Sequence, residues 1–127
     1  KETVPSNIVE VSTHYMTDDE LLTMVHEATF RYYWDGAEKI SGLALENISG
    51  RSNMIATGAS GFGIMGIISG VERGFITRQQ AVERLKKIVS FLKKAETFHG
   101  AYSHFIDGST GKVEPFFGKK DNGADLV

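Results

Sequence analysis

The residues of this sequence best suited to chemistry are two aspartates near its end, Asp121 and Asp125. They stand four positions apart, so a helix would carry both carboxylates on one face, with Cβ atoms about 5–6 Å apart. In a closed pocket their mutual repulsion would raise the pKa of one of them. Glycoside cleavage needs one protonated and one ionised acid, but the opposed pair usually comes from different segments, so these two are better interpreted as members of an acidic cluster. The plainer alternative is a favourable negative charge at the positive end of a helix dipole.

The helix that would carry these aspartates is only begun in this sequence. Leu126 and Val127 start an apolar stripe, and no Gly, Asn or Pro stop signal follows them. We therefore expect the other half of any site they serve to lie outside these 127 residues.

Four further side chains are candidates for ligand binding. Trp34 and Asp35 place an indole beside a carboxylate at the end of a predicted helix, which suits a sugar, because the ring stacks on CH faces while the acid accepts hydroxyls; core packing is the alternative. Arg51 could clamp a ligand or pair with a loop carboxylate. His104 alone is typical of a structural histidine, and the other three histidines share no ligand spacing with it, so we expect no metal site.

The composition excludes several classes of protein. The apolar fraction is 41% and the charged fraction 24%, as in soluble globular domains and unlike disordered chains. The net charge is −2 and no basic stripe is present, so nucleic acid is not an expected partner. Without cysteine there are no disulfides or thiolate metal sites. The longest apolar stretch, 64–71, is too short to span a bilayer, so we expect no membrane insertion.

Two capping boxes predict where two helices begin. Thr17–Glu20 and Thr77–Gln80 each place a threonine three residues before Glu or Gln, ahead of residues with helical periodicity. We predict helices over 18–37 and 78–97. The core-facing stripe predicted for the first consists of Leu21, Val25, Ala28 and Tyr32.

A glycine-rich helix is predicted between them, over 56–73. Its glycines recur at spacings of three and four, and each costs about 1 kcal/mol relative to alanine, so the helix should recover stability by close packing and be buried on most sides. Its predicted apolar face consists of Ile64, Ile67, Ile68 and Val71. Residues 61–66 match the dinucleotide-binding pattern GxGxxG, but Met54–Thr57 is a poor strand and no βαβ unit surrounds it. Small-residue helix packing is therefore favoured, and no cofactor is expected.

Beyond Gly100 the periodicity becomes alternating. We predict a strand over 101–106, a turn over 107–111 and a return strand over 112–117, confined to a sheet edge by Pro115. The predicted fold is mainly α, with a small β-hairpin, built as an array of α-hairpins in two layers.

Several segments together resemble a known family. In order along the chain they are Phe30–Asp35 with Ser41–Ala44, Ile55–Gly63, Gly70–Arg78, and Tyr102–Asp107 with Thr110 and Gly111. This combination resembles the bacterial glycoamylase-like (glucoamylase-like) family, which includes endo-β-1,2-glucanases.

The resemblance implies a partial (α/α) toroid of the six-hairpin type, in which residues 1–127 form the N-terminal fragment of a single catalytic domain. It implies a glycoside hydrolase that cleaves a β-glucan, with β-1,2 linkages expected, by inversion through water. Asp121 and Asp125 would belong to the family's acidic cluster, whose third acid is expected one residue beyond Val127, and Trp34, Arg51 and His104 would be cleft residues by position. It further implies an oligo- or polysaccharide substrate, a periplasmic, extracellular or surface-attached location, and a monomer at full length.

Two other classes of function remain open at this point. One is a non-catalytic glycan-binding or glucan-synthase-associated helical domain. The other is a helical interaction module, which would be favoured if Trp34 and His104 lay on opposite sides of the fold. If partner hairpins are missing, the glycine-rich helix should expose apolar faces, so we also expect aggregation or a larger context.

Overall fold

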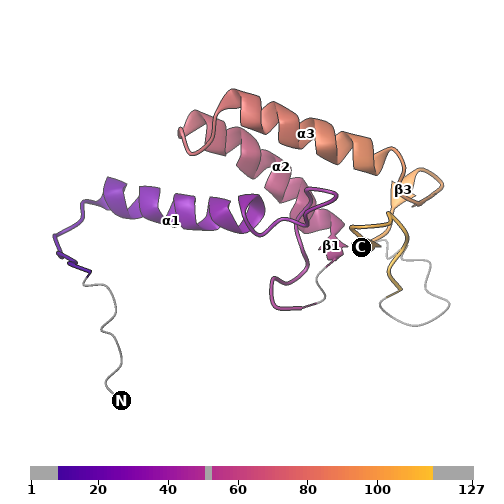
Figure 1. The fold of residues 1–127 in the computed structure, drawn as a ribbon, viewed down its shortest axis with the longest axis horizontal. Coiled ribbons are helices and arrows are strands. Elements are labelled where there is room, and N and C mark those ends of the chain that lie inside the picture. The colour runs from indigo at the N-terminus through magenta and orange to yellow at the C-terminus, as the bar shows by residue number, and fades with distance from the viewer. Residues whose placement is uncertain (1–8, 51–52, 116–127) are drawn as a thin grey trace, which may run out of the picture.

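The computed structural model describes residues 9–50 and 53–115 of the chain. Three helices follow one another in alternating directions across Figure 1, and the described strands are all short. The elements in chain order are α1 Asp18–Trp34, β1 Met54–Ala56, α2 Thr57–Glu72, α3 Arg78–Leu92, β2 Thr97–Phe98, β3 Ala101–Tyr102 and β4 Phe105–Asp107. The mainly α prediction is confirmed.

Both predicted capping boxes are present and begin α1 and α3. The Thr17 hydroxyl accepts a hydrogen bond from the Glu20 amide at 3.3 Å, and the Glu20 carboxylate accepts one from the Thr17 amide at 2.8 Å. Thr77 and Gln80 repeat the arrangement. The predicted helix ends, residues 37 and 97, lie beyond the observed ends, residues 34 and 92. After each helix the chain turns, and the backbone groups that follow form hydrogen bonds outside the helix.

The glycines of α2 allow α1 to approach closely, as predicted. A Cβ atom on Gly63 would lie 3.0 Å from the Tyr33 ring, and one on Gly70 would overlap the Phe30 ring. Since Phe30 meets the later glycine and Tyr33 the earlier one, the two helices are antiparallel.

No described residue covers the other side of α2. Phe62, Met65 and Ile68 are 69%, 64% and 62% exposed, so the prediction that α2 is buried on most sides was wrong for the described residues. Of the predicted apolar face, Ile67 is buried whereas Ile68 points outward. The apolar exposure expected without partner hairpins is confirmed.

The core lies between the three helices and the strand β1. It consists of Phe30, Leu43, Ile55, Ile67, Ile76, Ala81, Ile88 and Ile106. The stripe predicted for the first helix does not reach this core: Leu21 and Val25 are 47% and 49% exposed. Figure 1 shows the reason, since the first half of α1 extends past the ends of α2 and α3.

The strands pair differently from the predicted hairpin. β1 pairs antiparallel with β4, in the register Ile55–Ile106, and β2 pairs with β3. The predicted single strand over 101–106 is thus divided between two sheets. Of the predicted return strand, the described residues form only an isolated bridge between Ile106 and Val113. Residues 116–117 lie outside the described residues. Met54–Ala56, judged a poor strand from its sequence, is one because Ile55 is fully buried between Leu45 and Ile106.

Candidate functional site

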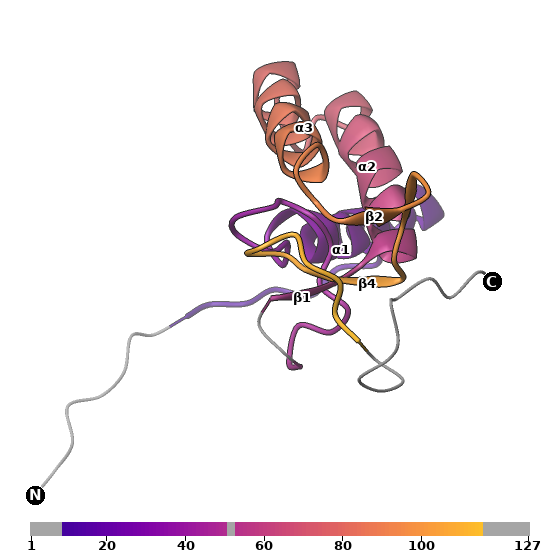
Figure 2. The same cartoon turned by 90° about the vertical axis from the view of Figure 1, so that its right-hand side faces the viewer.

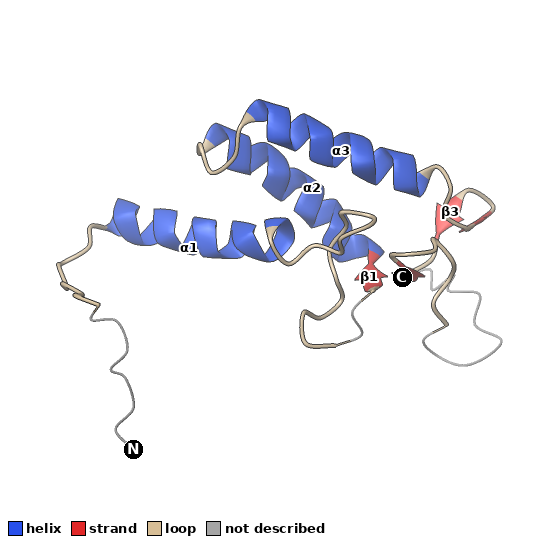
Figure 3. Ribbon diagram, viewed as in Figure 1, coloured by secondary structure: helices blue, strands red, loops and turns tan. Residues whose placement is uncertain are grey.

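The two ends of the helical layer are built differently. At one end the short turn 73–77 joins α2 to α3. At the other end lie residues 35–50, 53–56 and 93–115, which include all the described strands; we call these residues the loop end (Figures 2 and 3). Binding and catalytic residues concentrate in loops held by a rigid scaffold. The loop end is therefore the candidate site.

His104 is held at the loop end by the first residue of α2. Its carbonyl oxygen accepts hydrogen bonds from the Thr57 amide and the Thr57 hydroxyl, both at 3.0 Å, and the same hydroxyl also donates to the Ser103 carbonyl. The imidazole is exposed and contacts the Phe105 ring, with ring centroids 4.4 Å apart. The backbone is thus fixed while the imidazole remains open to a ligand.

Trp34 occupies a packed position at the end of α1. Its ring stacks on Phe30 with centroids 5.8 Å apart, and the Arg84 guanidinium lies over it, 4.2 Å from its centroid. Arg84 also donates a hydrogen bond to the Trp34 carbonyl at 3.1 Å. Burial lowers the pKa of Arg84, and the smaller effect of the Asp35 carboxylate opposes this. Core packing accounts for these contacts of the indole, and its sugar contact stays a prediction.

The two hollows lined by Trp34 do not include His104. Trp34 and Asp35 line a hollow of about 210 Å³ with Gln80 and Ile76, and Trp34 lines a second hollow with Glu83 and Lys87. His104 lines neither hollow. Asp35 is exposed and caps α1 through its amide, which donates to the Arg31 carbonyl at 2.8 Å.

Arg51, Asp121 and Asp125 lie outside the described residues. The described residues nearest to them in sequence belong to the loop end. Asn53 donates to the Asp107 carboxylate at 2.6 Å, and the Glu114 amide donates to the Phe105 carbonyl at 3.1 Å.

Two carboxylates that the sequence analysis did not single out hold the loop end together. The buried Glu38 accepts hydrogen bonds from the amides of Ile40 and Ser41 and from the Ser41 hydroxyl, at 2.6–3.0 Å. This role could not be predicted from the sequence, because glutamate is not a characteristic turn residue and the burial of Glu38 comes from tertiary packing.

Asp107 is the second anchoring carboxylate. It accepts hydrogen bonds from Asn53, from the Ser109 amide and hydroxyl, and from the Thr110 amide. Burial alone would raise the pKa of Asp107, but the hydrogen bonds from Ser109 and Thr110 together outweigh it and lower the pKa. The Asp-Gly-Ser-Thr sequence is a turn signal that could have identified this residue, since Asp accepts from amides two and three positions on. The carboxylates of Glu38 and Asp107 are therefore engaged in hydrogen bonds that anchor the loop end, which suits a structural role and not proton transfer.

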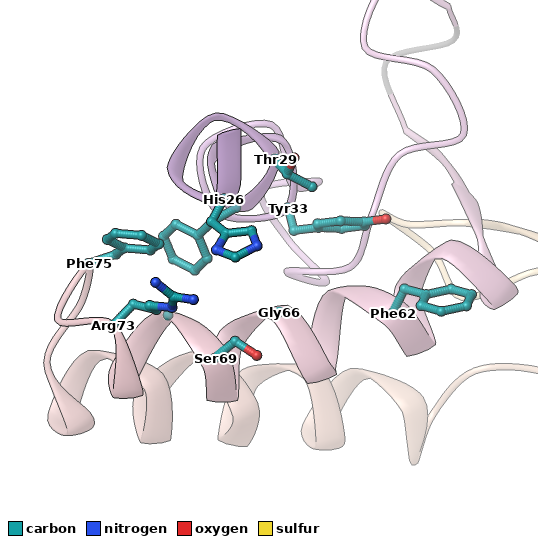
Figure 4. A pocket seen from close by; sticks show the side chains of 10 residues that line it. His26, Thr29, Tyr33, Phe62, Gly66, Ser69, Arg73 and Phe75 are labelled. Atoms are coloured by element: carbon teal, nitrogen blue, oxygen red, sulfur yellow. The ribbon is translucent and has the colours of Figure 1, made fainter. Parts of the chain in front are cut away.

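A larger hollow lies away from the loop end, between α1 and α2. This α1–α2 groove, of about 400 Å³, is lined by His26, Tyr33, Phe62, Arg73 and others (Figure 4). It is continuous with the exposed face of α2, because Phe62 belongs to both.

The described residues hold neither a cluster of metal ligands nor a membrane-spanning helix. Within 9–50 and 53–115, His, Asp and Glu do not gather in any group of three that could hold a metal ion. None of the helices described in that part is long and apolar enough to cross a bilayer.

Comparison with known proteins identifies the relatives of this chain. No protein-family model matches it. A curated relative from Parabacteroides distasonis, an exo β-1,2-glucooligosaccharide sophorohydrolase (non-reducing end), is 66% identical over 126 residues, which are 99% of this chain and 18% of the relative. The chain is homologous to the N-terminal part of glucoamylase-like and β-1,2-glucanase proteins. The resemblance noted in the sequence is thereby confirmed.

Solved structures of these β-1,2-glucanase relatives share the fold. The crystal structure of a β-1,2-glucanase from Parabacteroides distasonis matches with a TM-score of 0.87 and 68% identity, covering 92% of this chain and 17% of the other. An endo-β-1,2-glucanase from Chitinophaga pinensis, solved with sophorotriose and glucose, matches with a TM-score of 0.81 and 51% identity over 89% of this chain and 28% of the other. The chain thus spans under a third of each of these relatives.

Proposed function

We propose that this chain is the N-terminal portion of a longer glycoside hydrolase that cleaves β-1,2-glucan. The observation that carries the proposal is the 66% identity to a β-1,2-glucooligosaccharide sophorohydrolase across 99% of the chain. The exposed face of α2 and the α1–α2 groove support the larger size, because apolar surface of this kind is normally covered. Downstream helices would cover it and complete an (α/α) toroid.

The reaction proposed is hydrolysis with inversion, in which one acid and one base act on either side of the glycosidic bond. The base takes a proton from water, the water oxygen bonds to the anomeric carbon, the glycosidic bond breaks, and the acid protonates the leaving oxygen. Asp121 and Asp125 belong to the acidic cluster of this site, and downstream sequence supplies its remaining members. Arg51 and His104 contact the sugar from the loop end, and Trp34 with Asp35 contacts it from the end of α1.

The enzyme is further proposed to act outside the cytoplasm, in the periplasm or at the cell surface, and to be a monomer. Fractionation of cells with an antibody against the complete protein tests the location. Light scattering on the purified protein tests the oligomeric state.

Activity is tested on the complete polypeptide that contains this chain. Incubation with linear β-1,2-glucan should release reducing ends, and starch and β-1,3-glucan serve as substrate controls. The size of the first products then separates release of sophorose from chain ends from cleavage within the chain, and NMR of the first anomer formed reports inversion. Release from starch and not from β-1,2-glucan would overturn the linkage, and glucan binding without any turnover would favour the non-catalytic glycan-binding domain.

A further inference from the structure

The β2–β3 hairpin of the loop end, residues 97–102, has a turn conformation that the packing of the fold does not explain. Its strands pair through Thr97–Tyr102 and Phe98–Ala101, so His99 and Gly100 alone form the turn. Both have positive φ, 49° for His99 and 86° for Gly100, which is the combination of a type I′ turn. Asn or Gly is the usual first residue of such a turn, because a left-handed conformation strains most other side chains.

His99 is the one described residue other than glycine with positive φ. Such conformations cost about 1–3 kcal/mol and cluster at active sites, ligand clamps and switch regions. The Phe98 and His99 rings meet at a steep angle, with centroids 4.3 Å apart and planes at 77°. The turn therefore presents an imidazole and a phenyl ring together.

The base of the hairpin is hydrogen-bonded to its surroundings, and its aromatic side chains are exposed in the described part. The Tyr102 hydroxyl donates to the Leu92 carbonyl at 3.0 Å, and the Glu96 amide donates to the Gly111 carbonyl at 2.8 Å, so the base of the hairpin is fixed. Phe98 and Tyr102 are nevertheless 52% and 38% exposed. An exposed flat ring held on a fixed backbone beside a hydrogen-bonding imidazole matches a sugar, which offers apolar CH faces and hydroxyls at its edges.

From these observations we infer that the β2–β3 hairpin is a glucan-contacting element, in which the Phe98 ring packs on a glucose face and the His99 imidazole hydrogen-bonds a hydroxyl of the same chain. The inference rests on the proposed function for the identity of the sugar. The hairpin follows α3 and leads within two residues to His104, so both imidazoles belong to one continuous segment of the loop end. The residues act by binding substrate and take no part in bond cleavage.

The test compares His99→Asn and Phe98→Leu in the complete polypeptide. Asn suits the turn and removes the imidazole, so the melting temperature should be unchanged or higher. Leu keeps the apolar volume and removes the flat face. Each variant should raise KM for β-1,2-glucooligosaccharides about 3- to 10-fold and change kcat less than about 2-fold, as the loss of one stacking or hydrogen-bonding contact would. His14→Asn and Tyr15→Leu, in the exposed lead-in segment, are the matched controls and should leave KM unchanged.

The outcomes separate this inference from the proposed function. Unchanged KM in both hairpin variants of an active enzyme overturns the inference alone. A lowered melting temperature of Phe98→Leu with unchanged KM also overturns it, and indicates that the hairpin packs against downstream protein. An unmodified protein with no activity on β-1,2-glucan overturns both proposals.

Discussion

The Arg84 guanidinium lies over the Trp34 indole, 4.2 Å from the ring centroid, and donates a hydrogen bond to the carbonyl of the same residue at 3.1 Å. One side chain of α3 thereby holds both the ring and the backbone at the end of α1. The residue that the sequence suggested as a sugar platform is, in the structure, also the point at which two helices are joined.

Replacing this guanidinium should weaken the fold. We expect Arg84→Lys to lower the free energy of unfolding of the complete polypeptide by about 1–2 kcal/mol, because an ammonium cannot stack on the indole and bond to the carbonyl at once. Urea unfolding followed by tryptophan fluorescence measures the change. Arg78→Lys, at the exposed start of α3, is the control, and equal midpoints for the two variants would contradict the role assigned to Arg84.

Two glycines of α2 should respond in opposite directions to the same substitution. Gly70→Ala should destabilise the protein by about 1–3 kcal/mol, because the new methyl group overlaps the Phe30 ring. Gly61→Ala meets no atom within 4 Å in the described part and should stabilise the helix by up to about 1 kcal/mol. Thermal unfolding of both variants checks this prediction, and equal losses would indicate that downstream helices pack against Gly61 as closely as α1 packs against Gly70.

The stability contribution of Asp107 should depend on pH. Its pKa is lower in the folded protein, because the hydrogen bonds from Ser109 and Thr110 outweigh the effect of burial. Its contribution is therefore present above the ordinary aspartate pKa of about 4 and is lost as pH falls through the folded value. Asp107→Asn should lower the melting temperature at pH 7 and have a smaller effect at pH 3. A difference that grows on acidification would contradict the assignment, and Ser109→Ala, which removes one donor, should show part of the same effect.

Substituting the terminal aspartates should separate turnover from binding. We expect Asp121→Asn and Asp125→Asn each to lower kcat on β-1,2-glucan by about 10²–10⁴-fold, the range for loss of general acid or base catalysis, while glucan binding survives. Initial rates give kcat, and calorimetry with a β-1,2-glucooligosaccharide gives the affinity. Full activity in both variants would remove these residues from the acidic cluster.

The sequence predicted the parts of the fold that depend on local patterns. Thr17 and Thr77 mark helix starts because each capping box closes within four residues. The glycine spacing of α2 likewise predicted close packing. Of its predicted apolar face, Ile67 lies in the core and Ile64 and Val71 pack against it, whereas Ile68 is exposed in the described part.

The pairing of the strands could not be predicted in this way. Ile55 and Ile106 are neighbours in space through tertiary packing, and the turn 107–111, although present, closes a single bridge in the described part. The same holds for the site: Trp34 was recognised by residue type, but its neighbours Phe30 and Arg84 come from the packing of helices. The place of His99 in the hairpin turn could not be predicted either, because a left-handed backbone is not visible in a residue type.

The pairing of β1 with β4 sets an order for assembly during synthesis. Asn53 and Asp107, which are bonded at the edge of this sheet, stand 54 positions apart, so the helices between them leave the ribosome before the sheet can close. Long-range contacts form late, because the entropy lost on closing a long loop is recovered only when the contacts are made. We therefore expect residues 53–56, which form the partner of β4, to stay open to proteases on nascent chains until residue 107 has emerged, after α2 and α3 have formed.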